Sequence, residues 1–154
     1  MSSLQIASSA SKRPASRSIA QVAALAIGAW WVANGVGAFL VDSNLATSHV
    51  HGGGDLFGLA ITANGWHAMF HLLPGVVGIA AARRPQPALV YTLAAGALYC
   101  VVGGYGLVLG GTSIGVIAVD ASGDLVHVIE GLLTFAAGVS TLLVGGPWGR
   151  SRGV

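Results

Sequence analysis

The stretch Ile19–Val41 has the sequence IAQVAALAIGAWWVANGVGAFLV and contains no charged side chain. A helix needs about 20 predominantly apolar residues to cross the hydrocarbon core of a bilayer, and this stretch has 23. Because lipid offers the backbone no hydrogen-bond partner, a spanning segment of this kind is expected to be helical. The stretch therefore predicts a first transmembrane helix over residues 19–41.

Three more apolar stretches occupy residues 64–82, 88–110 and 124–146. Together the four predict an all-α fold, a four-helix transmembrane bundle over residues 19–146. The segments on either side, residues 1–18 and 147–154, are expected to be cytoplasmic tails, the first of them disordered and rich in Ser and Ala.

The composition agrees with a membrane protein and excludes several other classes. Of the 154 residues, 54% are hydrophobic and only 8% are charged, whereas a soluble domain carries about 25% charged residues. Intrinsic disorder requires low hydrophobicity and high net charge, so it is excluded for the chain as a whole. Cys100 is the single cysteine, which excludes a disulfide framework and a cysteine-based zinc site. The net charge of +2 is too small for a nucleic-acid-binding surface.

The basic residues indicate the orientation of the helices. All 7 Lys and Arg fall before the first stretch, between the second and the third, or after the fourth, which is one side of a four-helix arrangement. Asp42, Asp55, Asp120 and Asp124 fall in the two loops on the other side. Since cytoplasmic loops are enriched in Lys and Arg, the pattern predicts a multi-pass plasma-membrane protein with both termini in the cytoplasm.

The second and fourth stretches resemble each other. His71-Leu-Leu-Pro-Gly75 aligns with His127-Val-Ile-Glu-Gly131. The first and third stretches match more weakly, with these pairs in register: Trp30 with Tyr99, Gly35 with Gly104, and Gly37 with Gly106. The chain is therefore predicted to consist of two tandem helical hairpins of the same orientation, a parallel repeat about an axis along the membrane normal.

Four ionisable side chains inside the apolar stretches form a candidate polar cluster: His67, His71, His127 and Glu130. His67 and His71 are four residues apart, so they share one face of the second helix. His127 and Glu130 are three apart and share a face of the fourth helix. Because ionisable groups in a membrane are costly and rarely face lipid, the histidines are expected to face one another across these two helices.

The sequence leaves several roles open for this cluster. Interhelical hydrogen bonds would contribute about 1 kcal/mol or less each. The three histidines and Glu130 could instead supply zinc ligands, or His71 and His127 could hold a haem from facing helices. Proton handling by Glu130 is the remaining alternative. Since no metal-site motif is complete, no cofactor is expected.

Other residues are expected to be structural, namely Asn64, Pro74, Gly75 and Gly131. Pro74 lies inside the second helix and deprives the carbonyl of Phe70 of its helical donor, which predicts a kink and a neighbouring group that satisfies this carbonyl. Ser122 or Asp124 is expected to cap the start of the fourth helix.

Two blocks of the sequence resemble a known family. They are Leu56–Gly75, which contains Asn-Gly-Trp-His-Ala-Met-Phe-His-Leu-Leu-Pro-Gly, and Ser122–Gly131, which contains Asp-Leu-Val-His-Val-Ile-Glu-Gly. In these blocks the chain is similar to small, mostly actinobacterial membrane proteins catalogued as domain of unknown function 4383. The resemblance covers about residues 19–146. The positions that match the family pattern are Asn64, His67, His71, Gly75, His127 and Gly131, whereas Glu130 stands where an aliphatic residue is usual.

The resemblance implies a fold and a membrane location but no activity. A nucleophile and base of a peptidase or transferase are not evident, so the protein is expected not to be an enzyme. The leading hypothesis is a small structural, scaffold or accessory membrane protein. The alternative is a haem- or metal-binding membrane protein that uses His67, His71 and His127, and the third is a small transporter or channel. The expected partners are the lipid bilayer and other membrane proteins or a second copy, for which Gly106 and Gly110 form a weak dimerisation motif.

The predicted topology can be tested by labelling single cysteines from outside intact cells. A cysteine placed at Ser48 or Ser113 should react with an impermeant thiol reagent, because both positions lie in loops on the outer side. A cysteine at Gln86 should not react. Labelling at Gln86 in intact cells would contradict the four-span arrangement.

Overall fold

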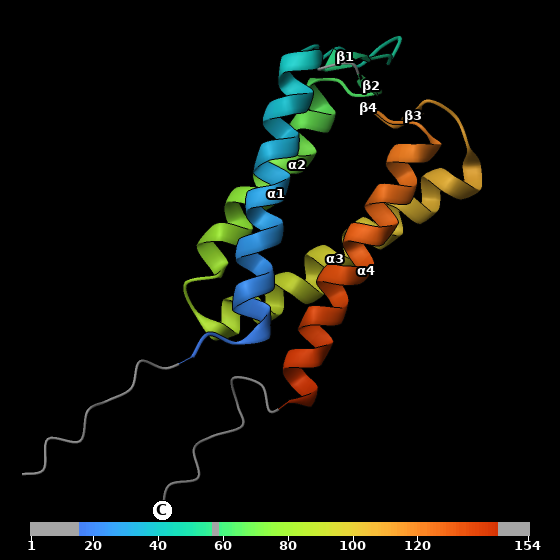
Figure 1. Cartoon of the computed structure of the whole chain (residues 1–154). Helices are drawn as coiled ribbons and strands as arrows, with labels where there is room; N and C mark the ends of the chain where they lie inside the picture. Colours follow the sequence, from blue (N-terminus) through green and yellow to red (C-terminus); the bar gives the residue numbers. More distant parts are fainter. Residues whose placement is uncertain (1–15, 57–58, 145–154) are drawn as a thin grey trace, which may run out of the picture.

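A computed structural model describes residues 16–56 and 59–144 of the chain (Figure 1). Its four α-helices are α1 (Ile19–Val41), α2 (Gly65–Ala81), α3 (Pro85–Leu109) and α4 (Ala121–Leu143). The all-α fold expected from the sequence is thus confirmed. Of the two expected tails, residues 1–15 and all of 147–154 lie outside the described residues.

Two short hairpins precede α2 and α4. In the first, β1 (Gly54–Leu56) pairs antiparallel with β2 (Leu59–Ile61). In the second, β3 (Ser113–Ile114) pairs antiparallel with β4 (Ile117–Ala118). Gly115 has a φ of 58° in the turn between β3 and β4, a left-handed conformation that glycine adopts without a steric penalty.

Two helices begin earlier than the hydropathy pattern predicts. α3 begins at Pro85, because proline suits the first turn of a helix, where its missing N–H would have no partner. α4 begins at Ala121 with Asp120 as its N-cap, whose side chain accepts hydrogen bonds from the backbone N–H groups of Ser122 and Gly123. The prediction that Ser122 or Asp124 caps this helix was therefore wrong. Asp124 lies inside the first turn and is buried.

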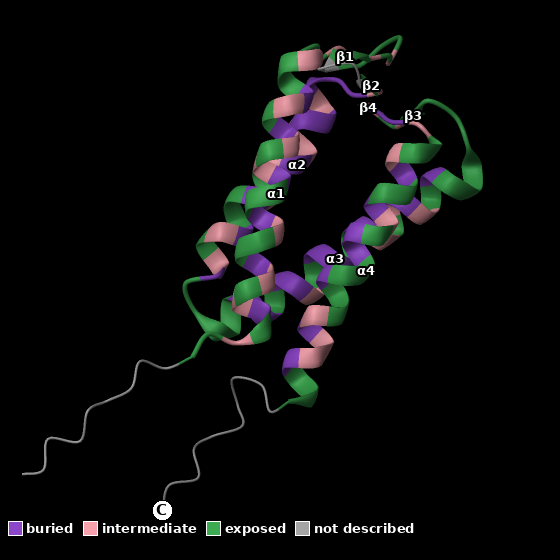
Figure 2. Cartoon of the chain, in the orientation of Figure 1, coloured by how far each residue is buried: buried purple, intermediate pink, exposed green. Residues whose placement is uncertain are grey.

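The helices have the length and the surface of membrane spans. α1, α3 and α4 are each long and apolar enough to cross a bilayer. α2 has 17 residues, the lower limit for a spanning helix. Exposed positions run along the outside of all four helices, while buried positions face inward (Figure 2). Many of the exposed side chains are large and apolar, including Leu40, Val76, Val108 and Leu143, and a bilayer would cover them.

The helices pack as two antiparallel hairpins, α1 with α2 and α3 with α4 (Figure 1). Within the first, a Cβ added to Gly75 would lie 2.8 Å from the carbonyl oxygen of Gly28. Within the second, a Cβ added to Gly131 would lie 2.8 Å from the carbonyl oxygen of Gly96. Each hairpin thus depends on a pair of glycines that lets two helix backbones approach closely.

These glycine contacts correct the register of the internal repeat. Gly35 lies against the backbone of Ala68 and Leu72 in the first hairpin, and Gly103 lies against Asp124 and Val128, the equivalent positions of the second. Gly35 therefore corresponds to Gly103, not to Gly104. The same shift of one residue makes Trp31, not Trp30, the counterpart of Tyr99. The alignment of His71 with His127 is unchanged.

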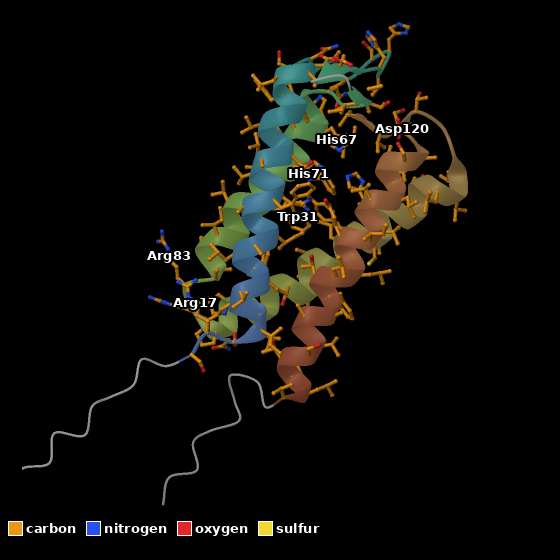
Figure 3. All side chains as sticks on the ribbon, in the orientation of Figure 1. Arg17, Trp31, His67, His71, Arg83 and Asp120 are labelled. Carbon is orange, nitrogen blue, oxygen red and sulfur yellow. The ribbon has the colours of Figure 1, made fainter. Side chains whose placement is uncertain are left out.

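The two hairpins meet through this equivalent pair of aromatic residues. The rings of Trp31 and Tyr99 are stacked with their centroids 3.8 Å apart, and both side chains are fully buried. Towards the end of the molecule that carries the β-hairpins, the two helix pairs diverge (Figure 1). His67 and His71 of α2 lie in this diverging half (Figure 3).

The glycine contacts predict different effects on stability for two glycine-to-alanine substitutions. Gly75→Ala should destabilise the protein by about 1–3 kcal/mol, because the new methyl group would press on the backbone of α1 and overpack the contact. Gly104→Ala is the matched control: nothing lies within 4 Å of its added Cβ, so it should be neutral or slightly stabilising. Thermal unfolding in detergent measures both. Equal destabilisation by the two variants would contradict the packing.

Candidate functional site

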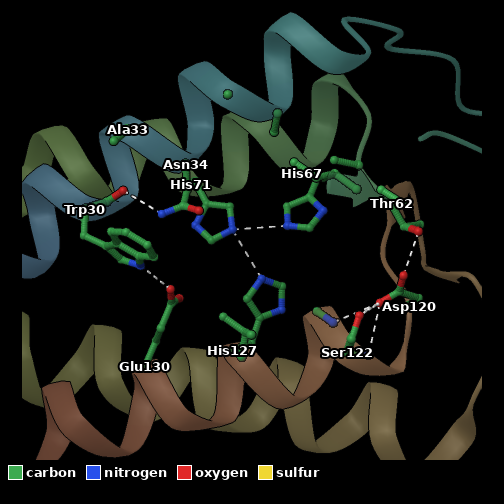
Figure 4. Close-up of a pocket in the computed structure, with 17 residues that line it drawn as sticks. Trp30, Ala33, Asn34, Thr62, His67, His71, Asp120, Ser122, His127 and Glu130 are labelled. Atoms are coloured by element: carbon green, nitrogen blue, oxygen red, sulfur yellow. Dashed lines mark hydrogen bonds between the residues drawn. The ribbon is translucent and has the colours of Figure 1, made fainter. Parts of the chain in front are cut away.

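Three buried histidines converge between α2 and α4. The Nε2 atoms of His67 and His71 are 3.1 Å apart, and those of His71 and His127 are 3.3 Å apart (Figure 4). One ring nitrogen from each residue lies within 4.8 Å of the others. The exposed fractions are only 7% for His67, 5% for His71 and 1% for His127. The fold thus brings together His67, His71 and His127 as the helical spacing predicts.

The orientation of His71 follows from the proline in its helix. Pro74 has no N–H, so the carbonyl of Phe70 lacks its donor within α2, and the hydroxyl of Tyr99 donates to it at 3.0 Å. The Tyr99 oxygen also lies 3.3 Å from Nδ1 of His71. Because the single hydroxyl proton is used by Phe70, the Nδ1–H of His71 is the donor in this second contact. The Nε2 atom of His71 then carries a free lone pair.

A backbone carbonyl fixes the ring of His67 in the same way. Its Nδ1 lies 2.7 Å from the carbonyl oxygen of Ala118 in β4, so Nδ1 carries the proton. Asn64, the N-cap of α2, positions this strand by accepting from the N–H of Ala118 and donating to the carbonyl of Val116. The loop before α4 thus leaves Nε2 of His67 unprotonated and directed at His71.

His127 is oriented by ring packing. Its imidazole stands edge-on to Phe70, with ring centroids 5.7 Å apart, and edge-on to Tyr99, at 5.5 Å. Its Nδ1 is buried and has no hydrogen-bond partner. Among the described residues, the only other buried side-chain nitrogen or oxygen atom without a hydrogen-bond partner is Oδ1 of Asp124.

The converging nitrogens have the geometry of metal ligands. With the proton on Nδ1 in both rings, the Nε2 lone pairs of His67 and His71 face each other across 3.1 Å, and a bound cation would remove the repulsion between them. Zinc binds imidazole nitrogen at about 2.0–2.1 Å in tetrahedral sites, which places neighbouring ligand nitrogens about 3.3–3.4 Å apart. Metal-binding histidines also typically donate their other N–H to a carbonyl or another acceptor, as His67 and His71 do.

Glu130, the fourth member of the predicted cluster, lies apart from this convergence. Its two carboxylate oxygens accept hydrogen bonds from the indole N–H groups of Trp30 and Trp31, at 2.5 and 2.8 Å. Indole nitrogen only donates, so the arrangement suits an ionised carboxylate. Glu130 still lines the same cavity as the histidines. This role of the tryptophans was not predicted from the sequence, although Glu130 is the only carboxylate deep in an apolar stretch and is a natural acceptor for their N–H groups.

Asp120 closes the site at the end nearest the β-hairpins. Besides capping α4, its carboxylate accepts a hydrogen bond from the hydroxyl of Thr62 at 2.7 Å, which joins the two halves of the repeat. The hydrogen bonds from Ser122, Gly123 and Thr62 lower the pKa of Asp120 to about 2. Asn64 is the equivalent N-cap of α2. Its side chain forms hydrogen bonds in the other direction across the repeat, with Val116 and Ala118 in the loop before α4.

The fold and the site define a helical membrane protein of two repeated hairpins with a histidine cluster at their junction. A family model described as "Domain of unknown function (DUF4383)" matches residues 21–140. The chain therefore belongs to this family, as the resemblance of its two sequence blocks indicated. Comparison with curated proteins and with solved structures finds no match.

The contacts of Asp120 predict a pH-dependent contribution to stability. Its pKa is lower in the folded protein than its ordinary value, so the stabilisation is present above about pH 4 and is lost as the pH falls towards 2. Asp120→Asn should lower stability at pH 7 by about 0.5–1 kcal/mol, because the amide brings no charge to the helix N-terminus. The difference from wild type, measured by thermal unfolding in detergent, should shrink below pH 4. A constant difference down to pH 2 would contradict this assignment.

Proposed function

We propose that this protein binds one divalent transition-metal ion of the zinc class through the Nε2 atoms of His67, His71 and His127. The observation that carries the proposal is the approach of three imidazole nitrogens to 3.1 and 3.3 Å, with two of the rings held in the tautomer that a metal requires. Imidazole ligands suit zinc, copper, iron and nickel. Three protein ligands leave the fourth position of a tetrahedral ion open, as in zinc sites that bind a further ligand.

Glu130 would support the ion without binding it directly. A divalent cation held by three neutral imidazoles keeps its full charge in a medium of low dielectric constant, where an uncompensated charge is costly. The carboxylate of Glu130, held by Trp30 and Trp31, supplies a negative charge on the wall of the same cavity. The carboxylate thereby offsets part of that cost.

We further propose that the protein lies in the plasma membrane with both termini in the cytoplasm and the histidines in the outer half. The distribution of charged side chains supports this orientation. Arg17 and Arg83 lie together at the end of the helices opposite His67 and Asp120 (Figure 3), and cytoplasmic loops are enriched in arginine. A metal ion would then reach the site from outside the cell.

A haem is not part of the proposal. A haem held by His71 and His127 would place its flat macrocycle between the two rings, whereas their Nε2 atoms are in direct contact at 3.3 Å. The structural or accessory role expected from the sequence is the competing hypothesis. In that case the histidines serve only as hydrogen-bonding groups between the helices.

Metal analysis of the purified protein distinguishes the two hypotheses. After exposure to Zn²⁺ or Co²⁺ and removal of excess metal, wild type should retain about one ion per chain, and Co²⁺ should give the intense visible absorption of a tetrahedral centre. His71→Gln and His127→Gln should each lose the ion, because the amide replaces a hydrogen-bonding group but not an imidazole ligand. The exposed loop residue His51 supplies the matched control, and His51→Gln should keep the ion.

The structural hypothesis predicts a different result in the same measurements. Wild type would retain no stoichiometric metal, and each histidine-to-glutamine substitution would lower stability by only about 1 kcal/mol. That outcome would overturn metal binding. If wild type binds the ion, Glu130→Gln should retain it, since the carboxylate is bound to the two indoles rather than directed at the histidines.

A further inference from the structure

A cavity of about 420 Å³ adjoins the histidines (Figure 4). This volume is at the lower end of the range of about 300–1,000 Å³ that is usual for small-molecule sites. Its polar wall contains the three histidines and Glu130, together with Asn34, Thr62, Asp120 and Ser122. Much of the remaining wall is apolar or small, with Trp30, Ala33, Gly37, Ala38, Ile61 and Val126. The cavity is therefore amphipathic, with the proposed metal at its polar side.

Exposed residues of the cavity wall on α1 and α4, among them Trp30, Ala33 and Val126, indicate that its mouth lies between these two helices. Near the end of the helices opposite the histidines the two are joined by a hydrogen bond from the N–H of Ala20 to the hydroxyl of Thr141, at 2.8 Å. Among the described residues, the hydrogen bonds between α1 and α4 continue only as far as Glu130. One wall residue from each helix is open to the outside, Trp30 at 53% and Val126 at 46% exposed.

The position of the mouth makes it accessible from lipid. The outer surfaces of the two helices carry exposed apolar side chains, among them Val36 on α1 and Ile129 on α4. The wall of α4 runs from Asp120 to Glu130, about 15 Å along the helix axis, or half of a hydrocarbon core of about 30 Å. The cavity thus opens sideways over the depth of one leaflet.

We propose that the cavity binds a single-chain amphiphile with a carboxylate head, such as a fatty carboxylate from the outer leaflet. This inference rests on the proposed metal site: the carboxylate takes the open fourth position of the ion held by His67, His71 and His127. The hydrocarbon chain leaves between α1 and α4, past Ala33 and Val126. A carboxylate suits the open position of the ion because carboxylate oxygen is an ordinary ligand of zinc. An apolar chain suits a mouth that faces lipid.

The test uses the full-length protein in detergent, loaded with Co²⁺, and follows the visible spectrum of the ion during titration. Dodecanoate should change the spectrum and saturate at one per chain, with an apparent affinity at least tenfold higher than that of acetate. Methyl dodecanoate should leave the spectrum unchanged because it has the chain but no carboxylate. These three probes separate the contribution of the head from that of the chain.

Two variants locate the binding of the chain. Ala33→Leu narrows the mouth and should weaken dodecanoate binding at least tenfold with little effect on acetate or on Co²⁺ content. Ala29→Leu is the matched control, since Ala29 is also exposed on α1 but is not part of the cavity wall. It should bind dodecanoate as wild type does.

The outcomes distinguish this inference from the proposed function. If the protein binds Co²⁺ but dodecanoate and acetate act alike, the site takes a free anion and the amphiphile is excluded. The inference is equally overturned if Ala33→Leu and Ala29→Leu behave alike, or if no probe changes the spectrum. If wild type binds no Co²⁺, the proposed metal site fails, and this inference fails with it.

Discussion

The hydrogen bond from the hydroxyl of Tyr99 to the carbonyl of Phe70 connects the fold to the site. In a bilayer no water is available to satisfy a carbonyl that a proline has left without a donor, so a neighbouring helix must do so. Tyr99 of α3 meets this requirement for α2, and its ring stacks on Trp31 of α1. The same hydroxyl oxygen accepts from His71 and thereby sets which nitrogen of that imidazole is free. A backbone constraint thus determines the chemistry of the central histidine.

The internal repeat explains why two helices each bring a histidine to the same place. His71 and His127 occupy equivalent positions of the two hairpins and meet at 3.3 Å. Trp31 and Tyr99 are likewise equivalent and meet in a stacked pair. The repeat is not symmetric in its chemistry, however. His67 and Glu130 have no counterparts of the same type in the other hairpin, so the third histidine and the carboxylate bound by the two tryptophans belong to one hairpin each.

The close glycine contacts within each hairpin leave the junction between the hairpins comparatively open. Gly75 with Gly28, and Gly131 with Gly96, bring paired helices into backbone contact. Between α1 and α4 the helices diverge towards the β-hairpins, and the cavity lies there beside the histidines (Figures 1 and 4). The loops close its end through Asp120 with Thr62 and Asn64 with Val116. Tight packing inside the repeats and looser packing between them together place a cavity next to the three histidines.

The sequence by itself determined the helical class, the approximate spans and the face that each histidine occupies, because apolar length and helical periodicity are local properties of the chain. It also indicated that the carbonyl of Phe70 needs a donor, since Pro74 removes one within the same helix. It did not identify Tyr99 as that donor, Trp30 and Trp31 as the partners of Glu130, or Asp120 as the cap of α4. Nor did it give the correct alignment of α1 with α3 in the internal repeat, which differs by one residue from the alignment suggested by residue identities. Those features depend on the rotation and the axial offset of one helix relative to another. Both are set in the folded chain, where glycines pack against the backbone of helices far away in the sequence.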